Sequence, residues 1–130
     1  VSNAVTWGNA SVLTLSANNQ IAINAAVSGT SGTLRLFPGS NAGVAQSAPI
    51  SVSRLVLAGD GNFTLTNAGN SIGTLSTNGG LGYVNGALTL TNAGALVLDT
   101  VSSVGALKLN VAGNLTQTAG AVTAPDCVGR

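Results

Sequence analysis

The sequence predicts an all-β protein that coils as a parallel β-helix of about five laps, with three short strands in each lap. Three observations support this prediction. Apolar residues alternate with other residues in short triplets, a seven-residue phrase returns after one lap, and no segment repeats apolar residues at helical spacing. We expect residues 1–130 to form one such solenoid.

The triplets have the pattern of short strands that are buried on one face only. In each, the first and third residues are apolar, and the middle residue is often Thr, Ser, Arg or Lys. Because successive side chains of a strand point to opposite faces, two apolar residues enter a core and the middle one faces outward. Gly and Asn residues between the triplets supply turns. The triplets are Leu13–Leu15, Ile21–Ile23, Leu34–Leu36, Ile50–Val52, Leu55–Leu57, Phe63–Leu65, Leu88–Leu90, Leu96–Leu98 and Leu107–Leu109.

The spacing of the predicted strands is itself periodic, with a lap of roughly 20 to 27 residues, which is within the range of solenoid repeats. Three series of strands follow one another around each lap. The first begins near Leu13, Leu34, Leu55, Leu81 and Leu107, the second near Ile21, Val44, Phe63, Leu88 and Leu115, and the third near Val27, Ile50, Ile72, Leu96 and Val122.

One phrase is nearly identical in two successive laps. FTLTNAG occupies residues 63–69 and LTLTNAG occupies residues 88–94. Parallel stacking of laps places each residue of one copy beside its counterpart in the other. We therefore expect paired leucines in the core, paired threonines outside and a ladder of side-chain amides at the turn. The expected pairs are Leu65 with Leu90, Thr64 with Thr89, and Asn67 with Asn92.

An antiparallel β-sandwich is the main alternative, because it also contains many short strands at regular intervals. A sandwich, however, has no physical need for one phrase to recur at every third strand. The recurrence at the lap distance therefore favours the parallel β-helix.

Two segments interrupt the pattern. Residues 37–49 are bracketed by Pro38 and Pro49, neither of which donates a backbone hydrogen bond, so we expect a loop that bulges from the rod. Residues 76–86 are rich in Gly, and we expect Tyr83 within them to be exposed.

The charge and the apolar runs of the sequence argue against two classes of partner, nucleic acid and the membrane interior. Charged residues are 5% of the chain and the net charge is +1, which gives no electrostatic reason to expect nucleic acid as a partner. Apolar runs are three to five residues long, far below the ~20 residues of a membrane-spanning helix, so we predict no transmembrane segment.

Residues that carry enzymatic or metal chemistry are scarce. There is no His, and the single Cys127 excludes an internal disulfide. The only acids are Asp60, Asp99 and Asp126, and the first two follow strands of different series, which places them at different corners. Paired catalytic carboxylates must lie within about 5–10 Å of each other. We therefore predict no catalytic residues, no cofactor and no metal site.

Three stretches, residues 7–37, 48–75 and 88–122, resemble the filamentous haemagglutinin family, the large exoproteins of two-partner secretion in Gram-negative bacteria. The phrases that carry the resemblance include SVLTLSANNQIAIN, FTLTNAGNSIGTL and LTLTNAGALVLD. The family implies a right-handed parallel β-helix, export across both membranes and adhesion at the cell surface.

This resemblance leads us to expect a non-enzymatic rod segment of a secreted bacterial adhesin. Its partner would be an unidentified receptor on a host cell or in the matrix. The alternative is a fibre subunit that stacks end to end as a homo-oligomer, because the terminal laps of a β-helix expose unpaired backbone and core.

Overall fold

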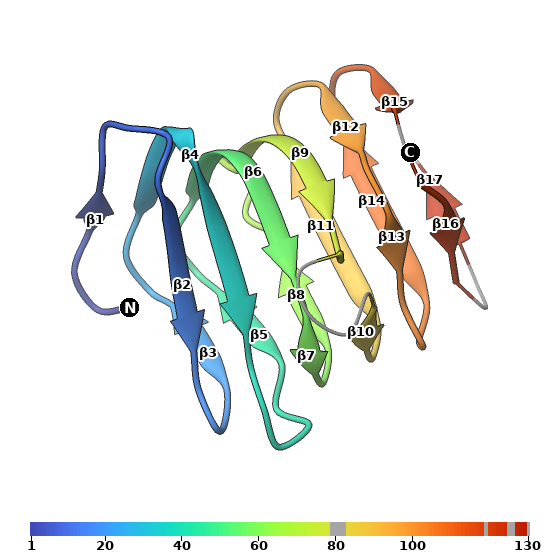
Figure 1. The fold of residues 1–130 in the computed structure, drawn as a ribbon, viewed down its shortest axis with the longest axis horizontal. Coiled ribbons are helices and arrows are strands. Elements are labelled where there is room, and N and C mark those ends of the chain that lie inside the picture. The colour runs from blue at the N-terminus through green and yellow to red at the C-terminus, as the bar shows by residue number, and fades with distance from the viewer. Residues whose placement is uncertain (79–82, 119, 125–126, 130) are drawn as a thin grey trace.

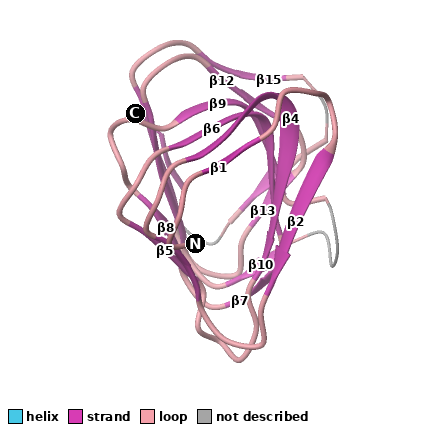
Figure 2. Cartoon of the chain, turned by 90° about the vertical axis from the view of Figure 1, so that its left-hand side faces the viewer, coloured by secondary structure: helices cyan, strands magenta, loops and turns pink. Residues whose placement is uncertain are grey.

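The computed structural model describes residues 1–78, 83–118, 120–124 and 127–129. Within them every regular element is a β-strand (Figure 1). Strands on the near side of Figure 1 run downward and those on the far side upward while the chain advances from left to right, so the coil is right-handed. Seen along its axis, the coil has a roughly triangular outline (Figure 2). The predicted fold class, a right-handed parallel β-helix, is confirmed.

Most strands of the described laps are short, as expected for a coil that turns a corner every few residues. They are β1 Val5–Thr6, β2 Val12–Ser16, β3 Ile21–Ile23, β4 Val27–Phe37, β5 Val44–Gln46, β6 Ile50–Leu57, β7 Gly59–Asp60, β8 Phe63–Leu65, β9 Ser71–Ser76, β10 Val84–Asn85, β11 Leu88–Asn92, β12 Leu96–Leu98, β13 Val101–Ser102, β14 Leu107–Val111, β15 Leu115–Gln117, β16 Val122–Thr123 and β17 Cys127–Gly129.

The strands form three faces. Sheet I contains β1, β4, β6, β9, β12 and β15 in that order, and β2 also pairs with β4. Sheet II contains β3, β5, β8, β11, β14 and β17. The third face consists of the pairs β7–β10 and β13–β16, which a bridge between Val84 and Ser103 connects. All these pairings are parallel, so each strand lies beside its counterpart in the next lap.

The laps differ in length. Val44 pairs with Phe63, nineteen residues later, whereas Phe63 pairs with Leu88, twenty-five residues later. A lap can change length because its corners absorb extra residues while its strands keep their register.

The predicted assignment of strands to series is wrong in the last predicted lap. The reason is that the step from β11 to β14 is only nineteen residues, whereas the repeated phrase suggests twenty-five. The expected strand at Leu107 belongs to sheet II, the one at Leu115 to sheet I and the one at Val122 to the third face. Their partners are Leu88 for Leu107, Leu96 for Leu115 and Val101 for Val122.

Two predicted strands merge into one in the middle laps. Strand β6 contains the triplets at both of its ends, because only Ser53 and Arg54 separate them and neither residue ends a strand. Leu55 then pairs with Leu75 in β9. Leu81, the expected member of this series, lies outside the described residues.

The segment 37–49 does not leave the coil as a bulging loop, which corrects the prediction. It contains β5, which pairs with β3 on one side and β8 on the other. The irregular part is the corner before β5, where Ser40, Asn41 and Gly43 have φ of 52°, 56° and 71°. Pro38 fits because its carbonyl accepts a hydrogen bond from the backbone N–H of Asp60 at 3.2 Å.

The core is a stack of aliphatic side chains inside the three faces. Burial alternates along the strands, as in β11 and β14, so the inward residues of successive laps cover one another. The buried hydrophobic residues include Ile23, Leu34, Leu36, Ile50, Leu55, Leu57, Phe63, Leu65, Ile72, Leu75, Val84, Leu88, Leu90, Leu96, Val101 and Leu107. Across the described residues there is no helix that is long and apolar enough to span a membrane.

Candidate functional site at the corners and ends of the coil

The leucines and threonines of the repeated phrase lie in register. Leu90 in β11 pairs with Leu65 in β8, and both side chains are fully buried. Thr89 pairs with Thr64, and both lie on the outer surface of sheet II, Thr64 exposed and Thr89 half-buried. The antiparallel sandwich is therefore excluded, because these two strands are parallel neighbours.

The expected amide ladder between Asn67 and Asn92 is wrong. Asn92 is buried; its Oδ1 accepts from the backbone N–H of Ile72 at 2.8 Å, and its Nδ2 donates to the Ile72 carbonyl at 3.0 Å. Asn67 is half-buried, and its Nδ2 donates to the Ser47 carbonyl at 3.2 Å. The two copies diverge because β8 ends at Leu65, whereas β11 continues to Asn92 and pairs with β14.

Asn70 has the role in its lap that Asn92 has in the next. Its side chain is fully buried, and Oδ1 accepts from the backbone N–H of Ile50 at 2.9 Å. Its Nδ2 donates to Gln46 Oε1 at 3.0 Å and to the carbonyls of Leu65 and Thr91 at 3.3 and 3.2 Å. Sequence reasoning missed this residue. A sequence signal that could have found it is the spacing to sheet I. Asn70 lies twenty residues after its partner Ile50, and Asn92 lies twenty residues after its partner Ile72.

Asp99 forms an ion pair across the laps of sheet I. Its Oδ2 lies 2.6 Å from an Nη of Arg54 in β6. The hydrogen bond from Arg54, together with one from the backbone N–H of Thr100, holds the pKa of Asp99 below its usual value. The pair connects residues that are forty-five positions apart, so it spans β9 between them.

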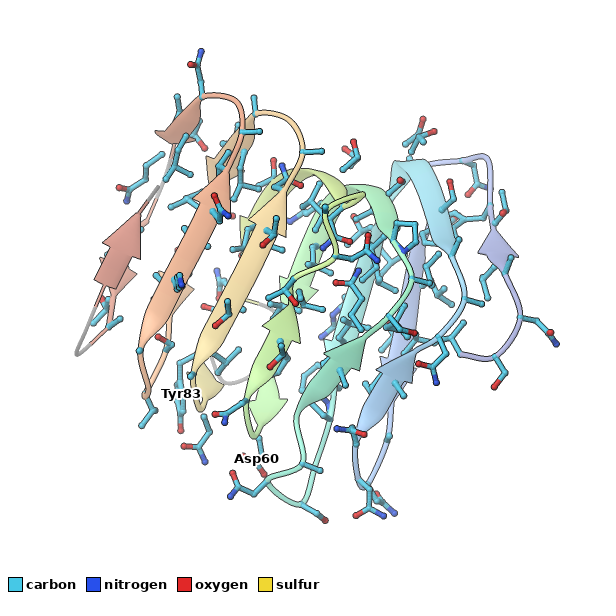
Figure 3. The ribbon with its side chains drawn as sticks, turned by 180° about the vertical axis from the view of Figure 1, so that it is seen from behind. Asp60 and Tyr83 are labelled. Carbon is cyan, nitrogen blue, oxygen red and sulfur yellow. The ribbon has the colours of Figure 1, made fainter. Side chains whose placement is uncertain are left out.

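Asp60 lies apart from this ion pair, on the third face. It belongs to β7, and its Oδ1 accepts from Nδ2 of Asn85 in β10 at 3.2 Å. Tyr83, partly exposed as expected, lies at the same lower edge of the coil in Figure 3. The different positions expected for Asp60 and Asp99 are confirmed, and Asp126 lies outside the described residues. The described part of the chain contains no cluster of three side chains suited to a metal ion.

At the N-terminal end of the coil the core is open. Trp7 follows β1, its backbone N–H bonds the Ser28 carbonyl at 3.0 Å, and its ring packs on the core. Its indole Nε1 donates to the Ser11 carbonyl at 3.1 Å. Gly29 and Gly32 of β4 lie directly beneath the ring, and a Cβ on either would collide with it. A hollow of about 330 Å³ remains beside the ring. Its lining residues are Val5, Trp7, Asn9, Ser11, Val12 and Leu13.

The opposite end of the coil also exposes core residues. Leu115 in β15 stacks on the buried Leu96, yet 38% of its own surface is accessible. Val122 in β16 stacks on the buried Val101 and is only partly buried. Both residues occupy inward positions that a further lap would cover.

The strands at both ends lack charged side chains. None occurs in residues 1–34 or in residues 109–125. Natural sheets usually protect their edge strands with Lys, Pro, bulges or a covering element. These edges therefore carry no electrostatic barrier against another strand.

These features define a repeat protein of the parallel β-solenoid class. The chain belongs to the family described as repeats of unknown function (DUF5649), whose profile matches residues 3–78 and 85–126. No curated protein and no solved structure matches the chain.

Proposed function

We propose that the chain is a non-enzymatic rod segment of a secreted bacterial filamentous adhesin, exposed at the cell surface. The observation that carries this proposal is the unbroken stack of laps, in which Leu65 and Leu90 have the same place in the core and Thr64 and Thr89 the same place outside. The resemblance of residues 7–37, 48–75 and 88–122 to filamentous haemagglutinins supports the cellular location.

The surface of sheet II suits an adhesive role. Its outward residues are small over four successive laps, namely Ala22, Ala45, Thr64 and Thr89, so β3, β5, β8 and β11 present a flat face, which ends at the exposed Lys108 of β14. A flat face of small residues makes many weak contacts over an extended partner, which fits attachment better than it fits a small ligand.

Attachment is tested with beads coated with the chain, applied to cultured epithelial cells and to plates coated with extracellular matrix. The control is Leu90→Asp, which places a charge in the core and is expected to unfold the coil. We expect native beads to adhere well above control beads. Equal adhesion of both would reject the adhesive role.

A second candidate is a fibre subunit that stacks end to end. The open core at both ends and the charge-free edge strands favour it. Electron microscopy at high protein concentration tests it: unbranched filaments support a fibre subunit, and single short particles reject it.

A further inference from the structure

We propose that the hollow beside Trp7 is a socket for the C-terminal lap of a second copy of this chain, with Leu115 of that copy as the inserted residue. The inference rests on the second candidate function and specifies which surfaces meet. Three observations support it: the shape of the socket, the polarity of the strands and the absence of charge.

The socket has a rigid floor. Gly29 and Gly32 have no side chains, and the indole ring fills the space above them. The bond from Trp7 Nε1 to the Ser11 carbonyl fixes the ring. The ring therefore cannot sink further to close the hollow, and the apolar surface of Val5, Trp7 and Leu13 stays open to an incoming aliphatic group.

The matching residue lies at the other edge of the same sheet. Strand β1 is one edge of sheet I, with β2 beside it on β4, and β15 is the opposite edge. In β15, Leu115 points inward above Leu96 and is 38% exposed. A copy placed head to tail sets this side chain over the socket and extends the aliphatic stack.

Strand polarity favours this arrangement, because it alone continues the parallel ladder of the coil. All described strands pair in parallel, and opposite ends of two copies continue the parallel ladder. Two like ends would have to pair antiparallel, since turning one copy around reverses its strands. A head-to-tail contact that does not close on itself gives an open filament.

The occupant is a second copy because the edge strands of sheet I, β1, β2 and β15, carry no charged side chain that would repel it. Residues 1–34 and 109–125 contain no charged side chain, so neither edge has the charges that normally block strand addition. The partner edge β15 is also uncharged, and Leu115 is its exposed apolar residue, which a charged peptide or a lipid headgroup would not match.

Association of the 130-residue chain is measured by sedimentation velocity over a range of concentrations. Trp7 is the only tryptophan, so its fluorescence reports the socket directly. We expect larger species at higher concentration, with a parallel blue shift of the emission as the ring loses water.

Two variants each block one end. Leu115→Asp puts a charge on the inserted residue, and Val12→Asp puts one at the rim of the socket, where Val12 is 57% exposed. Each is expected to weaken association roughly tenfold or more, because charging a buried anchor removes most of its contribution. Their equimolar mixture should form dimers and nothing larger, because each variant retains one intact and complementary end.

The matched control is Val104→Asp. Val104 is exposed to a similar degree, 56%, but it precedes β14, which is paired on both sides. The Val104→Asp variant should associate like the wild type. The circular dichroism spectra of all three variants should show the β signal of the native chain.

If the chain is monomeric at every concentration, the proposal is overturned. The hollow would then be a place that further laps of a longer chain cover. Association that Leu115→Asp and Val12→Asp do not weaken also overturns it, as do mixtures that form no dimer. These results are independent of bead adhesion. A monomer that still adheres rejects the socket but not the adhesin, and an associating chain that does not adhere rejects adhesion but not the socket.

Discussion

Asn92 binds both backbone groups of Ile72, a residue of the preceding lap. Its Oδ1 accepts from the Ile72 N–H at 2.8 Å and its Nδ2 donates to the Ile72 carbonyl at 3.0 Å. A side-chain amide carries a donor and an acceptor, as a peptide group does. The side chain of Asn92 therefore makes the two hydrogen bonds to Ile72 that the backbone of a neighbouring strand would otherwise make, at the corner between β11 and β12. The corner thereby satisfies polar groups that would otherwise be buried without partners.

The first prediction is that Asn92→Ala is strongly destabilising. The variant leaves the N–H and C=O of Ile72 unpaired in a buried position. Each of the two unsatisfied groups costs about 1–3 kcal/mol, so we expect the free energy of unfolding to fall by roughly 2–6 kcal/mol. Urea titration followed by circular dichroism measures it.

The control for Asn92→Ala is Asn67→Ala, the equivalent position of the repeated phrase. Asn67 is only half-buried, and its partners are the Ser47 carbonyl and the Gly69 N–H at an exposed corner. Water can replace these bonds, so we expect a loss of about 1 kcal/mol or less. If the two variants lost similar free energies of unfolding, the proposed backbone-like role of the Asn92 side chain would be contradicted.

The fold was predictable from the sequence because strand residues repeat with the lap. Leu65 and Leu90 stand in the same local phrase, and parallel stacking forces equal residues together. The positions of Leu115 and Val122 were not predictable in this way, because corners vary in length and carry no periodic signal. Strand triplets fix an inward or outward direction, but only the corners decide which face a strand joins.

The polar corner was harder to predict than the core. Asn67 and Asn92 have the same neighbours in sequence, yet the amide that matches Asn92 in space is that of Asn70. The difference arises because β11 continues two residues beyond the end that β8 reaches. The end of a strand depends on pairing with the next lap, here with β14, which a local phrase does not record.

The second prediction concerns the stacked core. Leu90→Ala removes a fully buried side chain between Leu65 and Leu109, its partners in β8 and β14. The neighbouring laps cannot collapse without breaking the ladder on both sides, so we expect a loss of about 3–5 kcal/mol. The outward Thr89→Ala should change stability by less, about 1 kcal/mol at most. Thermal and urea unfolding of both variants compare them, and equal losses would argue against an inward Leu90.

The third prediction concerns pH. The hydrogen bond from Arg54 lowers the pKa of Asp99 in the folded state, so the ion pair stabilises the fold above the usual carboxyl pKa of about 4. This contribution is lost as the pH falls through the lowered pKa. We expect Asp99→Asn to make the urea midpoint less dependent on pH between about 5 and 2.

Arg54→Gln provides an independent check of that pH dependence. It removes the same ion pair from the other side and leaves the carboxylate of Asp99 in place. If the pair is the cause, the urea midpoint of this variant should show the same weaker dependence on pH. A wild-type dependence in Arg54→Gln would mean that Asp99 acts through other groups.

The fourth prediction concerns the floor beneath Trp7. Gly29→Ala places a Cβ within the indole ring, so the ring must move away from the core. We expect a loss of about 1–3 kcal/mol from this overpacking, together with a red shift of the Trp7 emission as the ring becomes more exposed. Gly8→Ala is the matched control, because a Cβ there meets no atom within 4 Å.

A double-mutant cycle with Trp7→Leu separates the collision from any effect on β4 itself. If the ring is the cause, Gly29→Ala should cost much less in the Trp7→Leu background, whereas an unchanged cost would place the strain in the backbone of β4.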